Sequence, residues 1–320
     1  MTMGRHARKP ATRTVRSQRN TGDRTADLGT VAGVPRHVAR SGRAAGYLAA
    51  TALAVAVLVL VAGPRAIVSS AASLVASWQS PGPAAEPPAT TPSGPYRVVG
   101  LGDSIPAGSV CGCTSYVSLV AQDEAARRSR TADVANLAQG GLTTTGLLTQ
   151  LGDATVRRQI AAADLVLITI GANDFDTGSV DDDSCAAPEL SCFQPALKAQ
   201  QSQLADVLKQ VRTALATRSA TVLITGYWNV FLDGAVGATH GADYVRNSIS
   251  LTRTENTQIA AAARAQNGTY VDLFTPFKGN SGAEDDTSLL AADGDHPNAA
   301  GHRRIADAVE SAVASTRPAG

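Results

Sequence analysis

Three short runs of β-branched and aliphatic residues constrain the fold of this chain more than any other feature. They are YRVVGLG at 96–102, DLVLITIG at 164–171 and ATVLITGY at 220–227. Continuous apolar runs of this length are typical of strands that are buried on both faces of a parallel sheet. Two shorter runs, TADVANLA at 131–138 and GTYVDLF at 268–274, predict two more strands.

Helical patterns alternate with these runs. The sequence predicts helices over 115–128, 195–216, 242–266 and 297–314. In the second, apolar residues recur at helical spacing from Leu197 to Leu215, and Pro195 suits the first turn. Strands that alternate with helices predict an α/β fold, with three α/β/α layers around a mostly parallel five-stranded sheet. We place this domain at residues 96–316.

The region before the domain has an uneven charge. Residues 1–43 hold ten Lys and Arg residues against only two acids, Asp23 and Asp27, which gives a net charge of +8. The whole chain has a net charge of +1, so the remainder carries −7. A basic tail on a mildly acidic body argues against a nucleic-acid-binding domain, and we expect a disordered cytoplasmic tail.

Residues 44–64 contain no charged side chain and lie between Arg43 and Arg65. As a helix they would span roughly 30 Å, whereas the apolar part of a signal peptide usually has ~7–15 residues. We therefore expect a single-pass membrane anchor, with a cleaved signal sequence and a secreted body as the alternative. The positive-inside rule places the N-terminus in the cytoplasm and the body outside. Residues 65–95 are rich in proline and alanine and predict an extended linker.

All four cysteines, Cys111, Cys113, Cys185 and Cys192, follow the apolar segment. An even number of cysteines in an exported body favours disulfides, and three pairings are possible. The spacing matches no usual zinc pattern, so we expect no metal. Calcium at 181–183, with Asp174 or Asp176, is an alternative to a solvated loop.

Polar residues follow the predicted strands, at the sheet edge where parallel α/β folds carry their chemistry. A serine nucleophile needs a base, and Ser104 and His296 provide this pair. Asp293, three residues before His296, can hold the imidazole in one tautomer. The backbone N–H groups of Ser104 and Gly141 and the Asn173 amide can donate to an oxyanion. The sequence contains no G-x-S-x-G, P-loop, G-x-G-x-x-G or H-E-x-x-H motif.

The blocks GLGDSIPAG, NLAQGG, GAND and DGDHPN, in this order, resemble those of the SGNH or GDSL-type hydrolases. The resemblance covers roughly residues 96–315 and implies a flavodoxin-like fold. It makes Ser104 the nucleophile, His296 the base and Asp293 its partner, with an oxyanion hole of Ser104, Gly141 and Asn173. Gly140 competes with Gly141 for this role, and the family's usual spacing selects Gly141.

The resemblance implies a bacterial serine esterase or lipase that hydrolyses a lipid, an acylated glycan or a small ester. We expect a monomer that needs no cofactor and does not bind nucleic acid. Alternatives are an acyltransferase or carbohydrate deacetylase with the same site, or a domain without catalytic activity that binds the cell envelope. Four residues that follow the fourth predicted strand are candidates for the substrate pocket: Tyr227, Trp228, Phe231 and His240.

Overall fold

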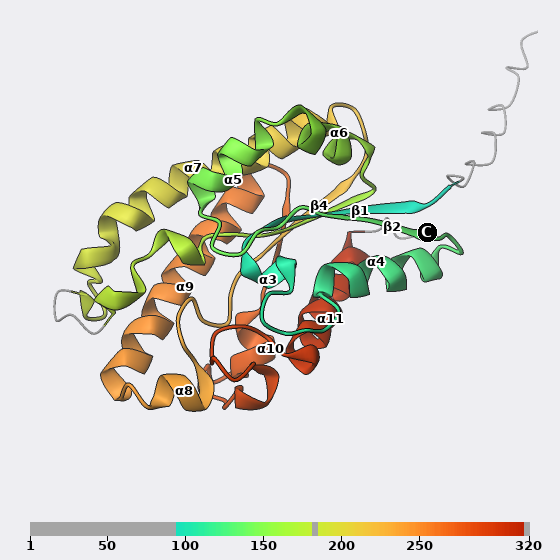
Figure 1. Cartoon of the computed structure of the whole chain (residues 1–320). Coiled ribbons are helices and arrows are strands. Elements are labelled where there is room, and N and C mark those ends of the chain that lie inside the picture. Colours follow the sequence, from blue (N-terminus) through green and yellow to red (C-terminus); the bar gives the residue numbers. More distant parts are fainter. Residues whose placement is uncertain (1–93, 181–184, 317–320) are drawn as a thin grey trace, which may run out of the picture. The chain divides into compact units, whose positions relative to one another are not determined.

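A computed structural model describes residues 94–180 and 185–316 (Figure 1). The basic tail, residues 44–64, nearly all of the linker and residues 181–183 lie outside this part. The expectations about the membrane anchor and the calcium alternative therefore stay predictions. Among the described residues, no helix is both long and apolar enough to cross a membrane.

Five parallel strands form one sheet with the order β2-β1-β3-β4-β5. All five were expected from the apolar runs, and their bounds are β1 Tyr96–Gly102, β2 Ala132–Asn136, β3 Leu165–Thr169, β4 Thr221–Thr225 and β5 Thr269–Val271. Every residue of β3 is buried, because β3 lies at the centre of the sheet between β1 and β4. The all-apolar strand pattern thus reflects burial on both faces.

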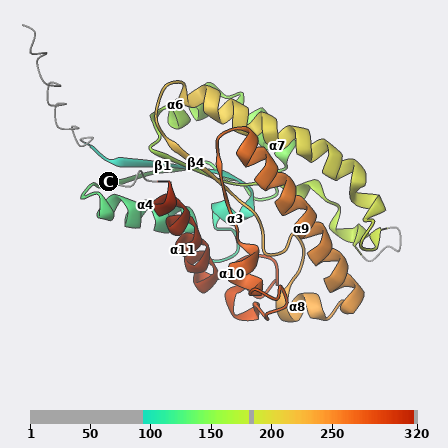
Figure 2. The same cartoon turned by 180° about the vertical axis from the view of Figure 1, so that it is seen from behind.

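Helices cover both faces of the sheet, which confirms the α/β prediction (Figures 1 and 2). One layer consists of α4 (Tyr116–Arg127) and α11 (Ala299–Ser315), which pack on each other. The other layer contains α5 (Thr144–Leu151), α6 (Ala154–Ala162), α7 (Gln194–Leu215) and α9 (Ala242–Ala265). Three short helices, α3 (Ser104–Ala107), α8 (Gly234–Ala238) and α10 (Phe274–Lys278), lie in the connections.

The start of α11 differs from the prediction. Asn298, not Pro297, precedes its first turn, and the Asn298 side chain accepts hydrogen bonds from the N–H groups of Ala300 and Gly301. Pro297 instead forms a β-bridge with Leu290. A side-chain N-cap satisfies N–H groups that have no partner within the helix, which a proline ring cannot do.

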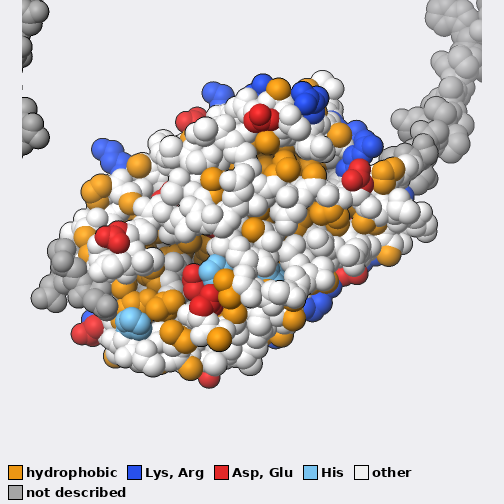
Figure 3. Space-filling view, in the orientation of Figure 1, with side chains coloured by type: hydrophobic (Ala, Val, Ile, Leu, Met, Phe, Trp, Pro, Cys, Tyr) orange, Lys and Arg blue, Asp and Glu red, His pale blue; other side chains and the backbone are white. Residues whose placement is uncertain are grey.

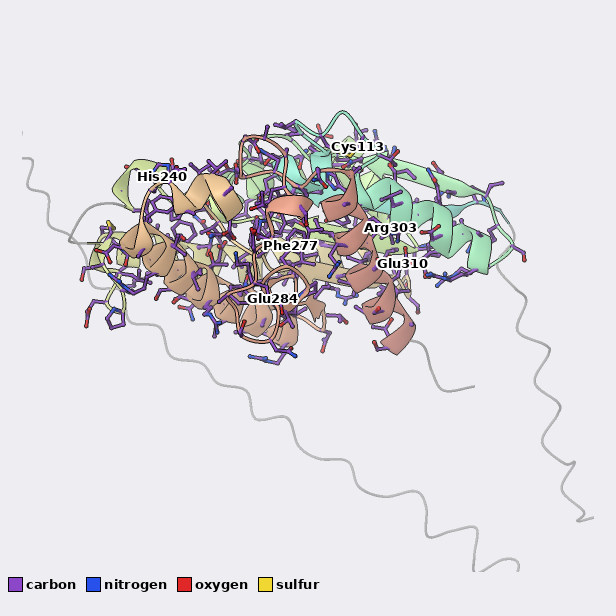
Figure 4. All side chains as sticks on the ribbon, turned by 90° about the horizontal axis from the view of Figure 1, so that it is seen from below. Cys113, His240, Phe277, Glu284, Arg303 and Glu310 are labelled. Atoms are coloured by element: carbon purple, nitrogen blue, oxygen red, sulfur yellow. A yellow bond between two sulfur atoms is a disulfide. The ribbon has the colours of Figure 1, made fainter. Side chains whose placement is uncertain are left out.

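A buried histidine and a cluster of ion pairs join α11 to α4. His302 is fully buried, and its Nδ1 accepts a hydrogen bond of 3.3 Å from the N–H of Tyr116, the first residue of α4. Burial lowers the pKa of His302 to about 4, so the ring stays neutral. Arg303 and Glu310 lie on α11 (Figure 4), and Arg303 binds both Glu310 and Asp123 of α4.

The cysteines form two local disulfides, Cys111–Cys113 and Cys185–Cys192. This pairing is one of the three that the sequence allows. Ligand atoms of Cys111, Cys113 and His302 lie within 4.8 Å of one another. Both sulfurs are already joined in the disulfide, so this group does not form a metal site as it stands.

Candidate active site

The turn after β1 presents Ser104. Asp103 is the N-cap of α3, and its Oδ1 accepts a hydrogen bond of 3.0 Å from the N–H of Ile105. Gly102 precedes it with a φ of 124°, and a Cβ there would lie 1.8 Å from the carbonyl oxygen of Thr169. Only glycine therefore allows β1 to approach β3 this closely at its end, and the turn leaves Ser104 at the edge of the sheet.

The last sequence block folds into a tight turn that pairs Asp293 with His296. Asp293 Oδ1 accepts hydrogen bonds of 3.1 Å from the N–H groups of Asp295 and His296, and its Oδ2 lies 2.7 Å from His296 Nδ1. Gly294 makes the turn possible, since its φ is 72° and a Cβ would lie 2.4 Å from Val236. Partial burial opposes ionisation of Asp293, but these hydrogen bonds outweigh it and lower its pKa.

The second and third blocks meet at the start of α5. The Asn173 amide nitrogen donates a hydrogen bond of 3.0 Å to the carbonyl oxygen of Leu142, which directly follows Gly141. Asp174 accepts a hydrogen bond of 2.9 Å from the N–H of Thr144. Gly141 has a φ of 75° and open space where a Cβ would be, so a substrate can approach its backbone.

Gly140, the alternative in the second block, lies nearer to the serine. A Cβ built on Gly140 would be 3.9 Å from the Cβ of Ser104. It would also be 3.3 Å from the hydroxyl of Ser109. The missing side chain of Gly140 therefore leaves room for the turn that carries Ser104, whereas the backbone of Gly141 is open to a substrate.

The phenol of Tyr227 connects the first block to the third. Its O–H donates to Asp103 Oδ2, and its oxygen accepts a hydrogen bond of 3.3 Å from the N–H of Ala172, next to Asn173. The Asn256 side chain fixes the Tyr227 backbone by two hydrogen bonds of 2.8 Å. Burial raises the pKa of Asp103 to about 7, although the bonds from Tyr227 and Ile105 oppose the rise.

A second buried acid lies behind the third block. Glu255 of α9 accepts a hydrogen bond of 3.0 Å from Gln200 of α7, which also donates to the carbonyl of Gly171. A Cβ on Gly171 would lie 2.0 Å from Glu255 Oε1, so only glycine is tolerated here. Burial raises the pKa of Glu255, and the nearby Asp174 raises it further.

Two adjacent cavities open at this edge, and Figure 3 shows acidic and histidine side chains gathered beside a hollow in this face. The first has a volume of about 250 Å³ and is lined by Ser104, Asn173 and Tyr227, among others. The second has a volume of about 390 Å³ and includes Phe231 and His240. They share three lining residues: Thr177, Val230 and Asp295.

The remaining pocket candidate, Trp228, lines neither cavity. Its indole is buried and stacks on Phe277 at 4.4 Å between ring centroids. Asp295, which is not among the residues predicted for the site, lines both cavities. In an extended chain this neighbour of His296 would point away, but the turn closed by Asp293 places its carboxylate 3.6 Å from His296 Nδ1.

The sequence model of the GDSL-like lipase/acylhydrolase family matches residues 101–304. Comparison with curated protein sequences gives no match. Among solved structures, a lipase from a goat rumen metagenome is similar, with 18% identity, a TM-score of 0.55, and coverage of 68% of this chain and 97% of that chain. This likeness shows the fold.

Two further structures are also similar. A variant of an acetyl-xylooligosaccharide esterase from Geobacillus stearothermophilus has 20% identity, a TM-score of 0.49, and coverage of 69% of this chain and 95% of that chain. A lipase/acylhydrolase from Enterococcus faecalis has 20% identity, a TM-score of 0.45, and coverage of 70% and 99% respectively. Because the family model spans more than half of the sequence, this chain belongs to the GDSL-like lipase/acylhydrolase family and is a serine-type carboxylic ester hydrolase.

Proposed function

We propose that this protein is an extracytoplasmic serine esterase in which Ser104 is the nucleophile, His296 the base and Asp293 its orienting partner. The observation that carries the proposal is the 2.7 Å contact between His296 Nδ1 and Asp293 Oδ2. Nδ1 is thereby assigned to the carboxylate, which leaves Nε2 to take a proton from serine. Ser104 and Asn173 share one cavity at the same edge of the sheet.

The reaction proceeds in two balanced halves. Ser104 Oγ bonds to the ester carbonyl carbon while His296 takes the hydroxyl proton, and the N–H groups of Ser104 and Gly141 and the Asn173 amide stabilise the oxyanion. The bond to the alcohol breaks, and His296 returns the proton to the leaving oxygen. Water then attacks the acyl-enzyme in the same way and releases the acid, so the proposed steps use only groups of this chain and water.

Turnover of p-nitrophenyl esters tests the proposal directly. The full-length protein, purified under oxidising conditions, is assayed with acetate, butyrate and palmitate esters. We expect Ser104→Ala to lower the rate by at least ~10³-fold and Asn173→Ala by ~10²–10³-fold. A fluorophosphonate should label the wild type and not Ser104→Ala. Turnover of Ser104→Ala at the wild-type rate would exclude this mechanism.

The location outside the cytoplasm is part of the proposal. Two disulfides that involve all four cysteines support it, because such bonds persist in oxidising compartments. Residues 44–64 would anchor the chain, or be removed as a signal sequence. A reporter that is active only outside the cytoplasm, fused after Gly320, should be active. An intact but inactive fusion would contradict the export argument.

A further inference from the structure

The two cavities at the candidate site are adjacent and share part of their lining. Asp295 lines both of them, together with Thr177 and Val230. Ser104 lines only the first, and none of the proposed catalytic residues lines the second. An ester whose carbonyl carbon lies at Ser104 therefore has additional space on the far side of Asp295.

The charges around this space have one sign. The linings contain the carboxylates of Asp103, Asp176 and Asp295, and neither lining includes a Lys or Arg among the described residues. Asp103 is held by Tyr227 and Ile105. Asp176 accepts hydrogen bonds of 3.0 Å from the N–H of Gly178 and the hydroxyl of Ser179. Two of the three carboxylates are therefore engaged by the protein itself.

Asp295 differs from the other two acids. Its only ion-pair neighbour among the described residues is His296 Nδ1, at 3.6 Å, and that nitrogen is already bound to Asp293 at 2.7 Å. A distance of 3.6 Å is too long for a hydrogen bond. Burial raises the pKa of Asp295, the charge of His296 opposes this rise, and the charge of Asp293 adds to it. No hydrogen bond to the Asp295 carboxylate is present among the described residues, which leaves this carboxylate available to a ligand.

The second cavity adds aromatic rings to this carboxylate. Phe231, His240 and Tyr244 line it with Asp295, and the rings of His240 and Tyr244 stack at 4.5 Å between centroids. The faces of Phe and Tyr rings attract cations, and quaternary ammonium ligands are bound in this way. A carboxylate beside such rings also attracts a cation.

We infer that the second cavity receives the alcohol part of the ester and selects an alcohol that carries an ammonium group, with Asp295 as the specificity-determining residue. The inference rests on the proposed esterase function. In that reaction the alcohol leaves from a carbonyl carbon held at Ser104, and Asp295 lines the cavity of Ser104 as well as the second cavity. The same charge disfavours esters of anionic alcohols.

Three thioesters with the same acetyl group test this. Acetylthiocholine is cationic, S-(3,3-dimethylbutyl) thioacetate is its neutral isostere, and S-acetyl-3-mercaptopropionate is anionic. Thiol release is followed with dithiobis(nitrobenzoate), which the protein itself does not consume because all four cysteines are in disulfides. We expect kcat/KM for the cation to exceed that for the neutral isostere by roughly tenfold, with the anion slowest.

Two variants separate the role of Asp295 from net charge. Asp295→Asn should bring the ratio of kcat/KM for the cationic ester to that for the neutral ester close to one, whatever its effect on the absolute rates. Asp206→Asn is the matched control, because Asp206 is exposed on α7, outside both cavities, and loses the same charge. It should keep the wild-type ratio. The ratio also cancels any effect of Asp295 on His296 that is common to all three substrates.

The outcomes distinguish this inference from the proposed function. Hydrolysis that depends on Ser104 but does not prefer the cation would overturn the inference and leave the esterase intact. An equal fall of the cationic-to-neutral ratio of kcat/KM in Asp295→Asn and Asp206→Asn would also overturn the inference, since this result would show a general effect of net charge. If Ser104-dependent turnover were found for p-nitrophenyl esters but for none of the three thioesters, the inference alone would be wrong. If it were found for neither set, both proposals would be wrong.

Discussion

Removal of the phenolic hydroxyl by Tyr227→Phe tests whether the site depends on a buried connection between its blocks. In the structure this hydroxyl donates to Asp103, which precedes Ser104, and accepts from the N–H of Ala172, which precedes Asn173. The phenylalanine ring keeps the packing but breaks both hydrogen bonds. The two loops that carry the proposed nucleophile, Ser104, and the proposed oxyanion donor, Asn173, are then no longer joined by hydrogen bonds through Tyr227.

The magnitude follows from the burial of Asp103. Its side chain is 1% exposed and has two hydrogen bonds, one to each carboxylate oxygen. Loss of one partner from a buried acceptor costs about 1–3 kcal/mol of unfolding free energy. We expect kcat to fall by ~10–100-fold, because small displacements of reacting groups are costly, and KM to stay within about twofold.

The pH dependence gives a sharper test than the size of the effect. Burial already raises the pKa of Asp103 to about 7, and the bond from Tyr227 is what lowers it most. An acid with a raised folded-state pKa stabilises the protein at low pH, and this stability is lost as pH rises from 3.8 through about 7. Without the phenol the ionised form is less favourable still, so the stability loss in Tyr227→Phe should be larger at pH 8 than at pH 5.

Urea unfolding at the two pH values and p-nitrophenyl acetate kinetics measure these quantities. Tyr270→Phe is the matched control, since it removes the same hydroxyl from a half-buried tyrosine on β5 that lines neither cavity. It should leave kcat nearly unchanged. A Tyr227→Phe enzyme with wild-type kcat, and a stability loss equal at both pH values, would refute the reasoning.

Three further changes probe other parts of the structure. Asp293→Asn should lower kcat on p-nitrophenyl acetate by ~10²–10⁴-fold in a folded protein, and wild-type turnover would contradict its orienting role. Burial lowers the pKa of His302 to about 4, so the free energy of unfolding of the wild type should fall by ~1.4 kcal/mol per pH unit between pH 6.5 and 4, relative to that of His302→Gln. Urea unfolding measures this, and an equal pH dependence of the two proteins would contradict it. Lys278→Met leaves the buried carboxylates of Asp233 and Asp286 without their cation and should cost ~3–5 kcal/mol by thermal or urea unfolding, whereas an unchanged midpoint would show that this ion pair adds no stability.

The sheet and the position of the site could be predicted from the sequence because both depend on local patterns. Apolar runs identify strands buried on both faces, and the residues after parallel strands must meet at one edge. The contact between Asp293 and His296 could also be predicted from the sequence, because a turn over three residues can fold the carboxylate back onto the imidazole ring. The disulfide pairing could be narrowed only to three possibilities, because sequence spacing does not fix which cysteines meet.

The direction of the Asp295 side chain and the partner of Tyr227 could not be predicted from local sequence patterns. In an extended chain the Asp295 side chain would point away from His296. In the structure, Asp293 accepts a hydrogen bond from the N–H of Asp295 and closes a turn, which changes the direction of that side chain. The partner of Tyr227, Asp103, lies 124 residues away in the sequence. No spacing rule connects two positions so far apart, and only the order of the sheet, in which β3 lies between β1 and β4, brings them together.

Tyr227 and Trp228 make the same point more sharply, because they are neighbours of similar chemical type. Tyr227 contacts Asp103 and lines the first cavity, whereas Trp228 stacks on Phe277 away from both cavities. The Asn256 side chain binds both the N–H and the carbonyl of Tyr227 and holds this backbone in place. An aromatic pair after a strand therefore predicts that one ring can reach the site, but long-range packing contacts, which the pattern does not contain, decide which ring does.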